Sequence, residues 1–279
     1  MEIKMPIGSF FKQKVLSVIP SYNKKIYNIC KRYVDMYNGD NDVDFLTNGE
    51  LYLMRRALLE CHTVFDIGAN VGHWAALALQ TNPHLSLHCF EPSHATFQHL
   101  LKNQFSSNMI CNNFGLSSVH KKTKLFVFED GSGINSLYKR HGLEDGWNLP
   151  PQEVEETIQL ETCDEYCNRN NLSDVGIDFC KVDVEGHELE VFKGMSQMLG
   201  KRKIKIIQFE YGGCNIDAKV LLKDIFEYFK QFEYTFYKIF PKELRKITRY
   251  DQPLENFQFQ SWAITSNEYN IDHISTSNK

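Results

Sequence analysis

The chain has 279 residues, enough for one large α/β domain with a modest extension. Its hydrophobic fraction of 42% and charged fraction of 24% are ordinary for a folded protein with a sizeable core. The formal net charge of -4 shows no basic surplus, which argues against a nucleic-acid partner.

The eight cysteines are scattered through apolar segments. None belongs to a CxxC pair, and Cys163 and Cys167 are the only close couple. This spacing fits buried, reduced thiols better than a zinc site or a disulfide framework. We therefore expect a reducing compartment, and hence a cytoplasmic protein.

Residues 1–44 precede the first strand pattern and predict an amino-terminal helical extension to a domain spanning 45–279. The opening MPIGSFFKQKVLSVIPSYNKK mixes apolar residues with lysines. Such an amphipathic stretch packs on its own domain or rests on a membrane surface or an oligomer partner. No segment approaches the roughly 18 apolar residues of a membrane span, and the apolar core of a secretory signal is missing.

From residue 60, short apolar strands alternate with amphipathic helices. The predicted strands are 63–68, 85–92, 109–115, 177–186, 203–213, 234–240 and 257–265. Helical spacing follows the first, second, fourth and fifth of them, with Gly200 ending the helix that carries Val191 to Leu199. This order predicts a Rossmann-like, doubly wound, mostly parallel seven-stranded sheet with an antiparallel edge strand. Residues 129–156 form a long insertion, which is often a lid.

The segment VFDIGANVGHW, residues 64–74, ends a strand on Asp66 and continues into a glycine turn. In an open α/β sheet, ligands bind at the carboxyl ends of the strands. A dinucleotide site uses GxGxxG, whereas the second glycine position here is Asn70. The turn DxGxNxG therefore suits a nucleoside with an amino-acid tail better than a diphosphate. S-adenosylmethionine is such a ligand, and a nicotinamide dehydrogenase is the remaining rival.

The next strand ends on Glu91, whose two oxygens are placed to accept hydrogen bonds from both ribose hydroxyls. A solvated strand end before Pro92 is the simpler alternative. Asn113 could reach the adenine edge or be an ordinary turn residue. Glu50 either approaches the methionine amine or belongs to the helix cap of TNGE. The residues expected to bind the cofactor are Glu50, Asp66, Gly68, Ala69, Asn70, Gly72, Glu91, Pro92, Ser93, Asn113 and Asp183.

VFDIGANVGHW, HCFEPS and KVDVEGHELEVFKGM resemble successive motifs of the FkbM-type methyltransferases, a branch of the class I S-adenosylmethionine-dependent enzymes. The resemblance covers residues 45–265, and DVEGHELEVFKG is its most specific part. It implies O-methylation of a hydroxyl on a sugar, a glycan or a small metabolite.

In KVDVEG, Lys181, Asp183 and Glu185 share one face if the strand stays extended. Glu210 ends the next strand, so several carboxylates should converge beside the methyl group. We expect Asp183 nearest the reacting centre, with Glu185 and Glu210 supporting acceptor or metal binding. A divalent metal on these three is the less favoured alternative to direct hydrogen bonds with the acceptor. His187 is either the general base or a solvated or capping residue.

Candidates for the acceptor pocket lie in the insertion, and they are Ser132, Asn135, Ser136 and Trp147. N-methylation of an amine or amide uses the same cofactor site and is a second enzymatic reading. A catalytically silent binding module is a third reading, but it would not need Gly68, Gly72 and Glu91 together.

Overall fold

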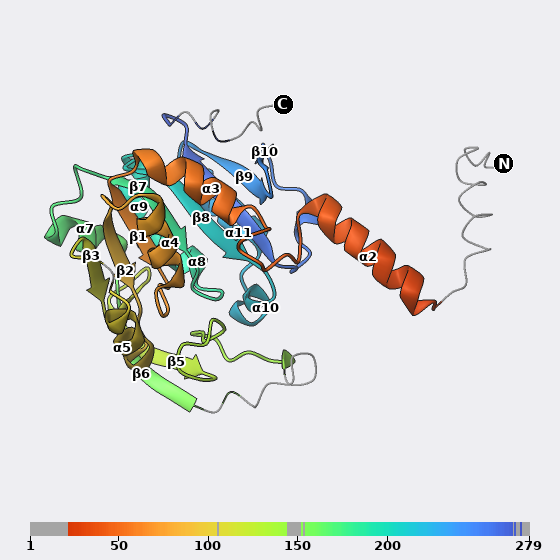
Figure 1. Ribbon diagram of the computed structural model, residues 1–279, viewed down its shortest axis with the longest axis horizontal. Helices are drawn as coiled ribbons and strands as arrows, with labels where there is room; N and C mark the ends of the chain where they lie inside the picture. Colours follow the sequence, from red (N-terminus) through yellow and green to blue (C-terminus); the bar gives the residue numbers. More distant parts are fainter. Residues whose placement is uncertain are drawn as a thin grey trace.

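The computed structural model describes residues 22–104, 106–143, 152, 154–269, 271 and 274. Residues 5–21 of the predicted amphipathic stretch and the candidate Trp147 lie outside these residues. In the described part, an eight-stranded sheet forms the centre of the molecule (Figure 1). From edge to edge its strands are β10 (Glu243–Ile247), β9 (Tyr234–Phe240), β11 (Gln260–Ser266), β8 (Ile204–Tyr211), β7 (Ile177–Val182), β1 (Thr63–Ile67), β2 (Ser86–Phe90) and β3 (Met109–Asn112).

The mostly parallel, doubly wound sheet predicted from the sequence is confirmed. β1 pairs in parallel with both β2 and β7, which puts Asp66 beside Cys89 on one side and beside Lys181 on the other. β11 is antiparallel to β8 and β9, as the short linker before it predicts. The strand count was too low, because β10 was read as part of that linker. Its sequence ELRKI has few apolar residues, and it pairs only with β9 through a tight turn after Phe240.

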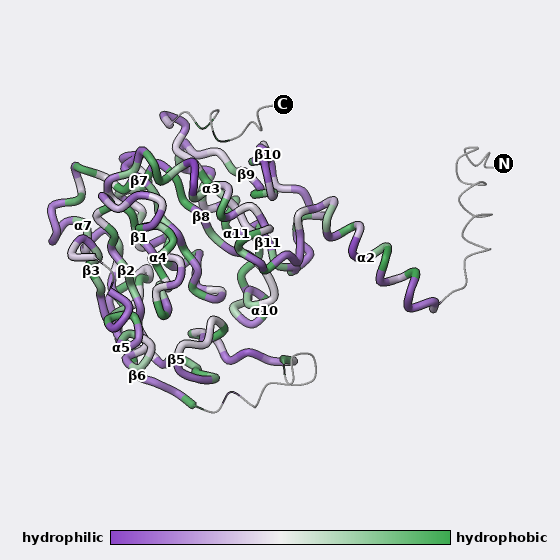
Figure 2. Tube along the Cα trace, in the orientation of Figure 1, coloured by the Kyte–Doolittle hydropathy of each residue, from purple (hydrophilic) through white to green (hydrophobic). Residues whose placement is uncertain are grey.

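Helices cover both faces of this sheet. One face carries α3 (Glu50–Ala57), α4 (His73–Thr81) and α5 (His94–Lys102), with η1 (Leu58–Glu60). The other carries α7 (Cys163–Arg169), α8 (Glu188–Lys193), α9 (Ser196–Gly200) and α11 (Leu222–Phe229). Each layer buries its own apolar cluster, so the sheet is apolar on both sides, as a parallel sheet requires. Figure 2 shows the resulting hydrophobic centre.

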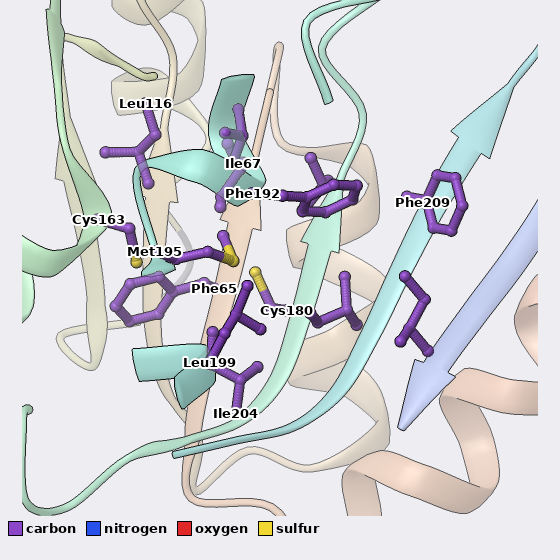
Figure 3. Close-up of a cluster of buried hydrophobic side chains, with 14 of the residues drawn as sticks. Phe65, Ile67, Leu116, Cys163, Cys180, Phe192, Met195, Leu199, Ile204 and Phe209 are labelled. Atoms are coloured by element: carbon purple, nitrogen blue, oxygen red, sulfur yellow. The ribbon is translucent and has the colours of Figure 1, made fainter. Parts of the chain in front are cut away.

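The second face shows how the core is built (Figure 3). Side chains of β1, β7 and β8 meet those of α8 and α9, and all of the labelled residues are buried. Phe192 is central to this cluster, because its ring packs edge-on against Phe209 at 5.5 Å and against Phe229 at 5.2 Å between centroids. Aromatic pairs at such spacing add to the stability gained by burial alone.

The helix predicted across residues 191–199 is two helices in the structure. α8 ends at Lys193 and α9 begins at Ser196. At the break, only glycine fits position 194, since a Cβ there would lie 1.9 Å from the carbonyl oxygen of Ser117. The segment after β8, where helical spacing was also found, forms two helices, α10 (Cys214–Ala218) and α11. Lys219, which has a φ of 57°, lies between them.

A smaller three-stranded sheet lies beside α5, in the order β4 (Gly115–Leu116), β6 (Val154–Glu161) and β5 (Lys121–Val127). β5 and β6 are antiparallel, and the insertion 129–156 connects them. Near the carboxyl terminus, η2 (Gln252–Leu254) precedes β11. The described part of the insertion returns over the carboxyl edge of the main sheet, where it reaches the site.

α2 (Lys24–Asn38) lies within the predicted extension 1–44 and projects away from the sheet (Figure 1). None of its residues is buried. Among the described residues, no helix combines the length and hydrophobicity of a membrane span. All eight cysteines are free thiols, and five of them are buried.

Replacing Phe192 by Ala should lower the free energy of unfolding by about 3–5 kcal/mol, because the change leaves a cavity beneath α8. Urea unfolding measures this loss. Val175→Ala is the matched control, since Val175 is 69% exposed and should change the free energy by about 0.5 kcal/mol or less. Similar losses for the two variants would contradict this view of the core.

Candidate active site

The glycine turn after β1 is tied to both neighbouring strands. Gly68 has a φ of 83°, and a Cβ there would fall 1.8 Å from the carbonyl oxygen of Asp183 at the end of β7. Only glycine fits both the backbone conformation and that approach. On the other side, the N–H groups of Gly68 and Ala69 each donate to the carbonyl of Phe90 at 3.0 Å. The turn is therefore held at the carboxyl edge of the sheet.

Glu91 is fixed at the end of β2 by that same turn. Its Oε2 accepts from the Asn70 N–H at 3.0 Å, and its Oε1 accepts from the Ser93 N–H at 2.9 Å. Glu91 is only 7% exposed, and burial raises its pKa to about 7. Each oxygen still has a lone pair after these bonds, so both can accept a ligand hydroxyl.

Asn113 and Ser93 support the Glu91 segment from outside. The Asn113 amide donates to the carbonyls of Glu91 and Pro92 at 3.0 and 3.3 Å. Ser93 caps α5 by accepting from the Thr96 N–H at 3.4 Å. These bonds favour a role for Asn113 in holding the turn, which was the alternative to adenine contact.

A cavity of about 90 Å³ opens between Glu91 and the ends of β1 and β7. Its polar lining includes Asn70, Glu91, Thr96, Ser132, Asn135, Ser136, Asp183, Glu185 and His187. The three insertion residues predicted from the sequence thus face the same space as Glu91. The volume is below the roughly 300–1,000 Å³ of typical ligand pockets, and residues 132–137 of the insertion form the covering segment.

Beneath the turn, the buried Lys181 lies between the buried Asp66 and the partly exposed Asp183. Its Nζ is 2.9 Å from Oδ2 of Asp183 and 3.6 Å from Oδ1 of Asp66. Asp66 is completely buried, neither of its oxygens has a hydrogen-bond partner among the described residues, and burial raises its pKa to about 6. Lys181 therefore lies next to Asp66, which was expected to bind the cofactor.

Glu185 leaves the strand geometry that was assumed for KVDVEG. β7 ends at Val182, and Glu185 has a φ of 53°. Its Oε2 accepts from NH1 of Arg140 at 2.8 Å, and Nε of Arg140 lies 3.5 Å from Asp217. Burial and the nearby Asp183 raise the pKa of Glu185, while Arg140 opposes them. Arg140 was missed in the sequence because it lies in the insertion, 45 residues from its partner.

Glu188 holds the turn that carries Glu185. Its Oε1 accepts from the N–H groups of Val184 and Gly186 at 3.3 and 3.1 Å. It is 1% exposed, and burial raises its pKa to about 7. An acid in the first turn of a helix, after a glycine, was the available sequence signal for this role.

His187 is buried between two hydroxyl groups. Its Nε2 is 2.9 Å from Oγ of Ser117, and its Nδ1 is 2.9 Å from the Tyr138 hydroxyl. Burial lowers its pKa to about 4, so the ring is neutral at pH 7. Because both nitrogens are engaged, these contacts favour a positioning role over proton transfer.

Glu50, at the start of α3, links this helix to β8 and β11. It accepts hydrogen bonds from Asn48, Gln208 and Ser261 at 2.7, 2.6 and 2.9 Å. Glu50 is 3% exposed, and burial raises its pKa. At the end of β8, burial and the neighbouring Asp183 raise the pKa of Glu210 well above its usual range.

A second cavity, of about 280 Å³, lies between α3, α4 and the ends of β7 and β8. It is lined by Glu50, Trp74, Lys181, Glu210 and other residues, and Gly68, Asn70 and Asp183 line both cavities. The two cavities therefore meet at the glycine turn. Within the described residues, no three acidic, histidine or cysteine side chains are grouped to hold a metal ion.

Residues 66–236, well over half of the chain, match the family model described as Methyltransferase FkbM domain. The chain belongs to the FkbM methyltransferase family. The glycine turn, Glu91 and Asp183 all lie within the matched segment.

The hexuronic acid methyltransferase AglP of Haloferax volcanii is 28% identical over 181 residues, which cover 63% of this chain and 69% of that protein. Among solved structures, the methyltransferase FkbM of Methylobacillus flagellatus shares 15% identity at a TM-score of 0.43, covering 73% of this chain and 43% of that one. The plantazolicin methyltransferase BpumL, solved with SAH, shares 8% at 0.41, covering 88% and 92%.

Lys181→Met in this FkbM methyltransferase should lower the free energy of unfolding by about 3–5 kcal/mol at pH 8, because the completely buried Asp66 and the partly exposed Asp183 lose their counter-charge. The loss should shrink near pH 5, since Asp66 has a pKa raised to about 6 and protonation removes its charge. Denaturant unfolding at both pH values measures this.

Lys205→Met provides the control, because Lys205 is 51% exposed and its ion pair with Asp178 spans 2.7 Å at the surface. That variant should cost about 1 kcal/mol or less. A loss for Lys181→Met that is the same at both pH values would show that charge is not the cause.

Proposed function

We propose that this FkbM methyltransferase transfers the methyl group of S-adenosylmethionine to a hydroxyl of a sugar, a glycan or a small metabolite. The observation that carries the proposal is the convergence of Gly68, Glu91 and Asp183 on adjoining cavities at the carboxyl ends of β1, β2 and β7. This is where an open α/β sheet binds its ligand.

The residues around the first cavity suit a nucleoside. Glu91 keeps two free lone pairs for the ribose hydroxyls, and its carboxylate would repel a 2′-phosphate. The turn carries Asn70 in place of the glycine that brings a pyrophosphate onto bare backbone. Both features favour S-adenosylmethionine over a nicotinamide dinucleotide.

The cofactor supplies an electrophilic methyl group, and the chain must supply a site for the acceptor proton. Asp183 suits this role because Lys181 binds its Oδ2, and it is 29% exposed toward the cavities. Its Oδ1 takes the proton of the acceptor hydroxyl. The Arg140–Glu185 pair orients the acceptor beside it. A sugar acceptor is supported by the name of the relative AglP, a hexuronic acid methyltransferase.

N-methylation is the second candidate, and one observation favours it. The side chain of Glu210 lines the second cavity and makes no direct hydrogen bond or ion pair within the described residues, although the positive charge of Lys181 is near. Together with Asp183 it would attract an amine.

NMR of the product made with ¹³C-methyl cofactor distinguishes O-methyl from N-methyl carbons by chemical shift. A silent binding module would bind no S-adenosylhomocysteine in calorimetric titration.

Glu91→Gln should weaken S-adenosylhomocysteine binding by about 10- to 100-fold, because charge-assisted bonds to the ribose are lost. The wild-type affinity should fall about tenfold from pH 8 to pH 6, since a carboxyl with its pKa raised to about 7 is protonated over that range. The variant should show no such fall. Calorimetry at both pH values tests this, and an unchanged pH profile in Glu91→Gln would assign the titration to another group.

Asp183→Asn should keep S-adenosylhomocysteine affinity and lower methyl transfer by about 100-fold or more, because the amide cannot take the acceptor proton. Mass spectrometry with deuterium-labelled cofactor, using extracts and a panel of sugars as acceptors, measures transfer. Undiminished activity in this variant would place the reacting centre elsewhere.

A further inference from the structure

Trp74, one of the residues that line the second cavity, has a buried hydrogen-bond donor without an acceptor among the described residues. Trp74 belongs to the first turn of α4, and its ring is 6% exposed and stacks on Phe179 at 5.9 Å between centroids. Its indole N–H has no partner among the described residues. A buried unpaired donor destabilises the folded chain, so it is kept only where something else compensates.

Most of the charged residues that line the second cavity with Trp74 are acidic. Glu50, Asp183 and Glu210 line the same cavity, and Lys181 is the only Lys or Arg of its described lining. Lys181 is already shared between Asp183 and Asp66. The carboxylates that line this cavity therefore suit a cation, and the unpaired N–H of Trp74 suits an anion.

A ligand that matches this pattern carries an ammonium and a carboxylate close together. The first turn of α4 adds to the anion side, because Gly72 provides no side-chain cap and the helix start carries partial positive charge. The volume of about 280 Å³ admits an amino-acid group. Since this cavity meets the Glu91 cavity at Gly68, a single ligand can fill both.

We propose that Trp74 binds the α-carboxylate of the cofactor's amino-acid end through its indole N–H, with the ammonium beside Glu50 and Glu210 of the second cavity. The assignment rests on the proposed function, because it requires the nucleoside in the Glu91 cavity. It makes Trp74 a residue that recognises the amino-acid end specifically.

Two ligands separate the amino-acid end from the nucleoside. S-adenosylhomocysteine carries both parts, whereas 5′-methylthioadenosine has the nucleoside and the thioether alone. Trp74→Phe removes the N–H and keeps a ring for Phe179. It should weaken S-adenosylhomocysteine binding by about tenfold, as for a hydrogen bond to a charged group, and leave 5′-methylthioadenosine binding unchanged. Glu91→Gln should weaken both ligands.

Trp262→Phe is the matched control, because Trp262 is fully buried in β11 and its N–H donates to Gln260 at 3.0 Å, outside both cavities. It should change neither affinity. An unchanged S-adenosylhomocysteine affinity in Trp74→Phe overturns the Trp74 assignment, and so does an equal loss for both ligands. A wild-type chain that binds neither ligand overturns the proposed function and this assignment with it.

A separate observation concerns α2, whose apolar side chains are unusually exposed. Ile29, Tyr33 and Met36 are 70%, 67% and 71% exposed and follow the spacing of one helix face. Tyr27 and Tyr37 extend this apolar surface at 62% and 68% exposed. No residue of α2 is buried against the body of the chain.

The amino-terminal region that includes most of α2 is basic, whereas the chain as a whole is acidic. Residues 1–34 contain seven Lys or Arg and one Glu, although the whole chain has a net charge of -4. Basic residues combined with aromatic and aliphatic ones on a helix are typical of helices that lie on anionic membranes. We infer that α2 docks on an anionic lipid surface and holds the methyltransferase there.

Flotation of the full chain with vesicles tests the lipid contact. The chain should bind vesicles of phosphatidylcholine with phosphatidylglycerol, bind phosphatidylcholine alone poorly, and lose binding at high salt. Ile29→Asp should weaken vesicle binding by about tenfold, whereas Val175→Asp, on the body, should not. Equal binding to both vesicle types, or none to either, overturns the inference. Self-association that Ile29→Asp abolishes, without vesicle binding, would assign the α2 surface to a second copy.

Discussion

The close approach of the Gly68 turn to the end of β7 is the constraint on which the site depends. Asp183 donates its backbone N–H to Ile67 at 3.0 Å, and its carbonyl oxygen occupies the space that a side chain on Gly68 would need. The approach places the Asp183 carboxylate beside the turn and lets both cavities meet there. A larger residue at position 68 would separate the strands at the point where they must converge.

Behind this contact, the site contains more buried acid than base. Lys181 compensates Asp66 and Asp183, and Arg140 compensates Glu185 and Asp217. Glu210 has no such partner, and burial raises its pKa. Unbalanced charge of this kind costs folding energy and is typical of functional sites. A ligand with positive charge would relieve it, which agrees with a sulfonium or an amine in these cavities.

The insertion links the two ends of the site. Asn70 donates to the Ser132 carbonyl at 3.2 Å, and Ser136 donates to the Glu185 carbonyl at 2.7 Å. Arg140 also binds Glu185, and Tyr138 binds His187, both in the segment after β7. Together these bonds hold the covering segment over the first cavity. Such closure shields the groups that line this cavity from water.

The sequence by itself determined the layered fold, the family resemblance and the strand-end positions of Gly68, Glu91 and Asp183. It could do so because burial imposes a period on each element, and because the carboxyl ends of parallel strands meet at one edge. Tertiary structure alone decided that Glu50 is bonded to Ser261, 211 residues away, and Glu185 to Arg140. It also decided that β10 joins the sheet, that the backbone of Gly194 lies against Ser117, and that the buried Trp74 N–H has no acceptor among the described residues. These features depend on contacts between distant segments, about which the local spacing of residues carries no information.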